Sequence, residues 1–311
     1  MFGILAVIGI LALSFVASII GVVSGVGSGI MIKPALELAT TLDILHVNLF
    51  SGSAVFVMAL TAIIRQRASL KDFKFRIGVP LAIGSAAGGV IGNIIFGRMG
   101  DDLAIVQSVL MLVVIGVLLL HQIFESKIKP LAFERVITYL ILGIILGMTA
   151  AFLGIGGGPL NLSALGFFAG MNLTTAALYS IFVITFAQGA NLIRWGVFSA
   201  DGFPAVDPAL LIAVLVGSVV GALIGSSLYK KVKGTEKGNS ILKKMYSAVL
   251  IFVIIVTIIN LVMYTVAEEN ITDPYPNGEN ISDEYNYGEN HLEEYYADEY
   301  STDYYNIDSL D

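Results

Sequence analysis

The chain contains no cysteine and little charge. Without cysteine, disulfides, thiolate metal ligands and cysteine nucleophiles are excluded from this 311-residue protein. Charged residues make up 13% of the sequence and hydrophobic residues 56%, whereas soluble domains carry about 25% charged residues. Long apolar runs recur along the chain, so the composition predicts a polytopic, all-α membrane protein.

Other absences narrow the function further. The three histidines, His46, His121 and His291, lie too far apart in sequence to indicate a metal site, and no nucleotide-binding motif is present. We therefore expect no metal, no cofactor and no nucleic-acid partner, and the lack of paired acids at membrane depth argues against an enzyme. No basic residue precedes Lys33, unlike in a cleaved signal peptide, so we expect the apolar N-terminus to remain in the membrane.

The acidic residues gather at one end of the chain. Residues 267–311 hold 14 of the 24 Asp and Glu residues and no Lys or Arg. The segment has eight tyrosines but little aliphatic content, so we expect a disordered acidic tail. Either it only solubilises the chain, or it binds a basic partner or calcium; the composition favours the first interpretation.

Six apolar stretches have the length of one membrane crossing. They lie at 44–64, 77–97, 103–123, 174–193, 209–229 and 245–266. Two further segments, 2–39 and 133–170, are too long for one crossing and too short for two with a turn. Each contains a glycine motif, GVGSG from Gly25 and GIGGG from Gly154. Because glycine in a helix interior costs about 1 kcal/mol relative to alanine, we interpret each segment as a helix, a break and a short helix.

The basic residues predict the orientation. Of the 17 Lys and Arg residues, 14 lie in the loops 65–76, 125–135 and 230–244. Basic loops tend to stay in the cytoplasm. This places the acidic tail outside and makes each broken segment a re-entrant hairpin without a net crossing. If both segments crossed fully, loop 230–244 would lie outside, so we favour hairpins.

The two halves of the apolar region match each other in one fixed register. This register aligns Gly25, Gly27 and Gly29 with Gly154, Gly156 and Gly158, and Ser51 with Ser180. After one insertion, GSAAGGVIG from Gly84 aligns with GSVVGALIG from Gly217. We expect two pseudosymmetric repeats, 1–125 and 126–266, each with one broken hairpin and three crossings. Three is odd, which predicts inverted repeats, a recurring design of secondary transporters.

The short helices after the glycine motifs would begin inside the membrane. A helix N-terminus presents unpaired N–H groups and about half a positive charge, so two of them facing one point would bind an anion. The predicted ligands from the two breaks are Gly25, Gly27, Ser28, Gly29, Gly154, Gly156, Gly157 and Gly158. Alternatively, these glycines only allow close helix packing. That role better fits the glycines that recur every four residues from Gly84 and from Gly217, which we call the period-four glycines.

Polar side chains at membrane depth form a second group of candidate ligands. They are Asn48, Ser51, Asn161, Ser180, Gln188 and Asn191. Each can hydrogen-bond an oxyanion, or instead satisfy a neighbouring helix or the broken backbone. Lys33 either counters the charge of a substrate or pairs with Glu37 four residues on, and we favour the pair. Glu37 and His46 are candidates for carrying a coupling proton.

The two motifs resemble the hallmark of the sulfite exporter TauE/SafE family, which is G-x-G-G-G followed within a few residues by proline, once per half. GIGGGPL from Gly154 matches the glycines, and GVGSGIMIKPAL from Gly25 has Ser28 at the middle glycine and Pro34 after it. The resemblance covers residues 1–266. It implies a membrane permease that moves sulfite, sulfonates or related organosulfur anions.

Together these features predict a secondary transporter of small anions that works by alternating access in the cell membrane, with the tail outside. The expected partners are a small anionic substrate, the lipid bilayer and a coupling ion, either a proton or sodium. A homodimer is left open. The alternative function is an anion channel.

Overall fold

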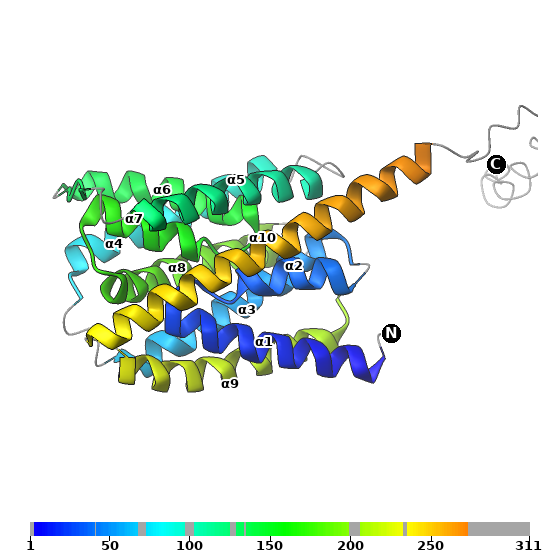
Figure 1. Cartoon of the computed structure of the whole chain (residues 1–311), viewed down its shortest axis with the longest axis horizontal. Helices are drawn as coiled ribbons and strands as arrows, with labels where there is room; N and C mark the ends of the chain where they lie inside the picture. Colours follow the sequence, from blue (N-terminus) through cyan, green and yellow to red (C-terminus); the bar gives the residue numbers. More distant parts are fainter. Residues whose placement is uncertain are drawn as a thin grey trace, which may run out of the picture. The chain divides into compact units, whose positions relative to one another are not determined.

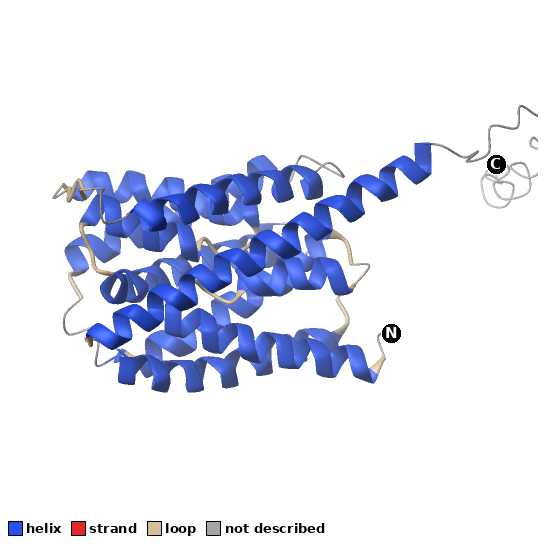
Figure 2. Cartoon of the chain, viewed as in Figure 1, coloured by secondary structure: helices blue, strands red, loops and turns tan. Residues whose placement is uncertain are grey.

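A computed structural model describes residues 3–40, 42–67, 73–96, 103–124, 129–133, 135–198, 206–232 and 235–272. These residues form ten helices and no strand (Figures 1 and 2). The helices are α1 (Ile4–Ser24), α2 (Gly29–Ala39), α3 (Ile44–Arg65), α4 (Phe75–Phe96), α5 (Leu103–Phe124), α6 (Val136–Leu153), α7 (Gly158–Ala169), α8 (Leu173–Phe198), α9 (Pro208–Val232) and α10 (Glu236–Thr272). Among them, eight are long and apolar enough to cross a membrane. The predicted all-α, multi-pass membrane protein is therefore confirmed.

The six predicted single crossings correspond to six of these helices. They are α3, α4, α5, α8, α9 and α10. Helix α10 is longer than the apolar stretch at 245–266, because it begins at Glu236 with a polar turn. The chain divides into two units, residues 1–266 and 267–311. The predicted disorder of the tail concerns residues that, beyond Thr272, lie outside the described part of the chain.

Both long apolar segments are broken at their glycine motifs, as predicted. Helix α1 ends at Ser24 and α2 begins at Gly29, while α6 ends at Leu153 and α7 begins at Gly158. Gly25 and Gly27 have φ values of 74° and 88°, and their counterparts in the second half have 65° and 78°. Only glycine adopts this left-handed region without strain. Ser28 has a φ of −78°, which any residue adopts, so serine is tolerated at this position in the first motif.

The short helices turn back toward the ends at which their hairpins begin. In the second hairpin, the backbone N–H of Phe133, just before α6, donates to the carbonyl of Phe168 in the last turn of α7 at 2.8 Å. In the first hairpin, α2 runs back toward the end of the bundle at which α1 begins (Figure 1). Both segments are therefore hairpins with a long and a short arm.

The period-four glycines lie where helices cross closely. A Cβ atom on Gly88 of α4 would overlap the carbonyl oxygen of Ile144 on α6, and one on Gly221 of α9 would overlap that of Phe15 on α1. Backbones can approach this closely only where side chains are absent. Each glycine helix thus packs on the long hairpin arm of the other half of the chain, α4 on α6 and α9 on α1.

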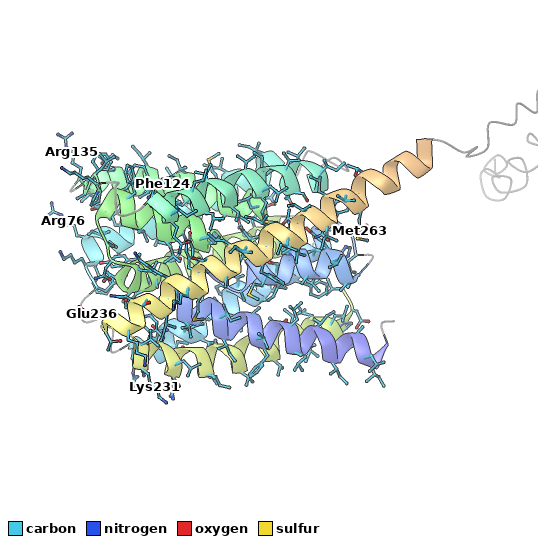
Figure 3. All side chains as sticks on the ribbon, in the orientation of Figure 1. Arg76, Phe124, Arg135, Lys231, Glu236 and Met263 are labelled. Carbon is cyan, nitrogen blue, oxygen red and sulfur yellow. The ribbon has the colours of Figure 1, made fainter. Side chains whose placement is uncertain are left out.

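Basic residues from three loops lie at the same end of the helices. Arg76, Arg135 and Lys231 lie at one end of the helices, and Met263 of α10 lies at the other (Figure 3). These three residues belong to the first, second and third basic loops of the sequence. These described residues of the three loops therefore lie on one side, as expected if all three loops face the cytoplasm.

Candidate functional site

The two helix breaks lie against each other. A Cβ atom on Gly158, the first residue of α7, would overlap the carbonyl oxygen of Val26, and one on Gly29, the first residue of α2, would lie 2.9 Å from the carbonyl oxygen of Ile155. Val26 and Ile155 are counterparts in the register that aligns the two halves. The first residue of each short helix therefore abuts a backbone carbonyl of the opposite break, and only glycine fits there.

Two serines hold the breaks together in a reciprocal way. Ser51 Oγ lies 3.0 Å from the carbonyl oxygen of Gly154 and 3.4 Å from that of Gly29. Ser180 Oγ lies 2.8 Å from the carbonyl oxygen of Gly25 and 3.5 Å from that of Gly158. Each serine thus links the break of its own half to the break of the other half. In the register that aligns the two halves, the two contacts of Ser51 correspond to the two contacts of Ser180.

We expect Ser51→Ala and Ser180→Ala to destabilise the protein by similar amounts, because each removes one donor from a buried backbone carbonyl. A buried hydrogen bond contributes about 1 kcal/mol. Thermal unfolding in detergent checks this, with Ser227→Ala as the control, since Ser227 is half-buried and donates to the carbonyl of Leu223 in its own helix at 3.1 Å. Unchanged melting temperatures in both buried-serine variants would show that the serines do not hold the breaks.

A small polar cavity lies beside the second break. It has a volume of about 50 Å³ and is lined by Leu45, Asn48, Leu49, Gly52, Asn93, Gln107, Ala150, Ala151, Gly154, Gln188, Asn191, Leu192 and Trp195. Helices α3 and α8 supply most of this lining, and α4, α5, α6 and Gly154 of the second break supply the rest. Five lining side chains are neutral amides, and none of these described lining residues is acidic. Amide N–H groups can donate to an anion without a competing negative charge.

Two of these amides have free hydrogen-bonding capacity. Asn48 Oδ1 and Asn191 Oδ1 are buried and have no partner among the described residues. Rotation about the last side-chain bond exchanges the positions of the amide oxygen and nitrogen, because this torsion is broad and roughly two-fold. Either side chain can therefore turn its NH₂ group into the cavity when an anion is present.

Lys33 places a positive charge directly behind the cavity wall. Its Nζ donates to Gln107 Oε1 and, at 2.9 Å, to the carbonyl oxygen of Leu153 at the end of α6. A Cβ atom on Gly154 would lie 3.2 Å from this Nζ. The ion pair that we favoured is also present, since Nζ lies 3.7 Å from Glu37 Oε1 and the two side chains are 1% and 3% exposed. Lys33 thus contacts both an acid and the cavity lining.

The structure brings four of the predicted ligands to this cavity. They are Asn48, Gly154, Gln188 and Asn191. Ser51 and Ser180 bind backbone instead, as described above. Gly25, Gly27, Gly156 and Gly157 face Ala177, Ile184, Val55 and Ala150 respectively. Gly29 and Gly158 abut the opposite break, while Ser28 and Asn161 are buried with side-chain oxygens that lack a partner among the described residues.

Part of the polar lining was not predicted from the sequence. Asn93 and Gln107 both lie within stretches predicted to cross the membrane, at 77–97 and 103–123. Their polar side chains at membrane depth could have indicated them, but the predicted polar ligands all lie on the helices that follow the glycine motifs. Gly52 lines the cavity at a point where any side chain would approach Gln188 Oε1, which lies 3.1 Å from the position of a Cβ atom.

Three amides of the cavity lining have apolar counterparts in the other half of the chain. In the register that aligns the two halves, Asn48 corresponds to Ala177, and Gln188 and Asn191 correspond to Ala59 and Ala62. The contacts of the two breaks differ in the same way, because Gly154 faces Asn48 whereas its counterpart Gly25 faces Ala177. The serine contacts between the breaks are therefore reciprocal, whereas each of these three amides occurs in one half only.

Eight candidate spans, two abutting helix breaks and a polar cavity beside them define a multi-pass helical membrane protein with an internal polar site. Residues 10–257 match the family model described as Sulfite exporter TauE/SafE. The chain belongs to this family of membrane transporters of sulfur anions, and the resemblance inferred from its two glycine motifs is confirmed. No curated protein and no solved structure matches the chain.

Proposed function

We propose that the protein is a secondary transporter of small sulfur oxyanions, such as sulfite or a short sulfonate, and that the anion binds in the amide-lined cavity. The observation that carries the proposal is the position of this cavity, which lies beside the second break and is lined by Gln107, the side chain that accepts a hydrogen bond from Lys33. Neutral donors next to one positive charge favour an anion over a cation or a neutral solute.

The size of the cavity supports a small substrate. A volume of about 50 Å³ has room for about three to five water molecules, since one water needs about 10–15 Å³ measured in this way. A sulfite ion, with one sulfur and three oxygen atoms, is of comparable size. A larger organosulfonate would need the cavity to open further.

The reciprocal contacts suggest how the site changes its exposure. Rocking one half against the other would break the Ser51 and Ser180 contacts in turn while leaving the helices intact. In this proposal the repeats are inverted, the basic loops face the cytoplasm of a cell membrane, and the acidic tail lies outside. The chain has no nucleotide-binding motif, so a gradient drives transport and no covalent chemistry is required.

Uptake of sulfur-35-labelled sulfite into proteoliposomes tests the proposal. We expect uptake that saturates and that is accelerated by unlabelled sulfite on the opposite side, because an alternating-access carrier exchanges its substrate. Non-saturating flux without this counterflow would instead identify an anion channel. The absence of any sulfite or sulfonate flux would contradict the proposed function.

A further inference from the structure

A chain of buried polar contacts leads from the cavity to helix α10. Lys33 Nζ contacts Gln107 of the cavity lining and lies 3.7 Å from Glu37 Oε1. Glu37 Oε2 in turn accepts a hydrogen bond from Asn260 Nδ2 at 3.1 Å, and the same Nδ2 donates to the carbonyl oxygen of Pro34 at 3.0 Å. A charge change in the cavity therefore acts on Glu37 through a single side chain.

We propose that the coupling ion is a proton and that Glu37 carries it, because the bound anion and Glu37 compete for Lys33. The inference rests on the proposed function, since it requires an anion in the cavity. Without the anion, the Lys33 ammonium neutralises the Glu37 carboxylate. With the anion, the ammonium turns toward the cavity, and Glu37 accepts one proton from water.

The driving force is the cost of a buried charge without a partner. The Glu37 side chain is 3% exposed, and a buried carboxylate that loses its counter-charge is strongly destabilised. Protonation removes that charge. For a monoanion the charge of the site is the same before and after, because one anion and one proton enter together. The Asn260 amide can bond either the ionised or the protonated acid.

Among the described residues, Lys33 is the charged side chain that lies next to Glu37. From α10 it is faced by Asn260 and by Tyr264, a phenol that interacts with the carboxylate. Helix α1 contains no titratable residue. On α3, His46 Nδ1 lies 3.6 Å from Asp43 Oδ2, a carboxylate that is 83% exposed, and α5 contributes the neutral amide of Gln107.

The sign of the pH dependence follows from linkage. The anion-bound form holds one more proton than the free form, so lowering the pH favours anion binding. Affinity should rise about tenfold per pH unit as the pH falls, over the range in which Glu37 is ionised without the anion and protonated with it. The protein carries the anion and the proton in the same direction.

Proton uptake on anion binding tests this inference directly. The full chain in detergent and weak buffer, with a pH indicator, is titrated with methanesulfonate, sulfate and thiosulfate, which stay fully ionised between about pH 6 and 9. We expect about one proton to be taken up per anion bound. Glu37→Gln should still bind the anion, with an affinity that does not change with pH and without proton uptake.

Two further variants complete the experiment. Asp43→Asn, which removes an exposed carboxylate near the end of α2, should behave as the wild type does. If Glu37→Gln does not fold, the neutral double variant Lys33→Gln/Glu37→Gln should fold and lose both anion binding and proton uptake. Anion binding without proton uptake in the wild type, or proton uptake retained in Glu37→Gln, would overturn the inference alone. Failure of the wild type to bind any sulfur oxyanion would contradict the proposed function.

Discussion

Gly158→Ala is expected to prevent the protein from folding. The added methyl group would overlap the carbonyl oxygen of Val26, a backbone atom of the opposite break that no side-chain rotation can move away. The two breaks would have to separate, with loss of the serine contacts between them. We expect the free energy of unfolding to fall by more than about 4 kcal/mol, a size that single substitutions reach only through a few mechanisms, of which overpacking in the interior is one.

The yield of monodisperse protein after detergent extraction measures this loss. The matched control is Gly116→Ala in α5, where a Cβ atom would meet nothing within 4 Å. Alanine also favours a helix over glycine, so the control should fold at least as well as the wild type. Normal yield and melting temperature in Gly158→Ala would mean that the breaks do not abut as described.

Asn48→Asp is expected to abolish anion binding while the protein stays folded. The substitution keeps the shape of the side chain but places a carboxylate in the cavity, beside Gly154 and close to Lys33. Like charges about 4 Å apart repel by about 4 kcal/mol at an effective dielectric constant of about 20. The new carboxylate would also form an ion pair with Lys33 and so compete with the bound anion for its ammonium group. We expect the affinity for sulfite to fall by at least about a hundredfold, measured by ligand-induced thermal stabilisation.

Asn172→Asp is the control for this change. Asn172 is exposed, and its Oδ1 accepts a hydrogen bond from the N–H of Thr175 at 2.9 Å at the start of α8. Aspartate is an equally good residue at this N-terminal position, so stability and sulfite binding should be unchanged. Sulfite binding to Asn48→Asp with wild-type affinity would place the anion elsewhere.

The helices and their breaks could be predicted because their signals are local. A span shows itself as an apolar run of sufficient length, and a break shows itself as alternating glycines in such a run. The Lys33–Glu37 pair could also be predicted, since residues four apart on a helix lie on one face. The division into repeats at residue 125 and their inverted order stay predictions.

The lining of the cavity could not be predicted in the same way. Asn93 and Gln107 lie on α4 and α5, and nothing in the sequence spacing shows that these helices meet α3 and α8 at the cavity. The role of the glycines at the starts of α2 and α7 was likewise hidden. We expected them to expose helix N-termini to a ligand, whereas Gly29 and Gly158 abut carbonyl oxygens of the opposite break. Such contacts depend on the packing of segments that lie far apart in the sequence.

An experimental structure with bound selenite is the most direct measurement of the central claim. Selenium marks the anion by anomalous scattering, and selenite has the shape and charge of sulfite. The claim predicts one selenium position in the cavity, within hydrogen-bond reach of Asn48 and Asn191 and beside Gly154 of the second break. Selenium bound only elsewhere, for example in the separate pocket between His121 and Lys243, would contradict it.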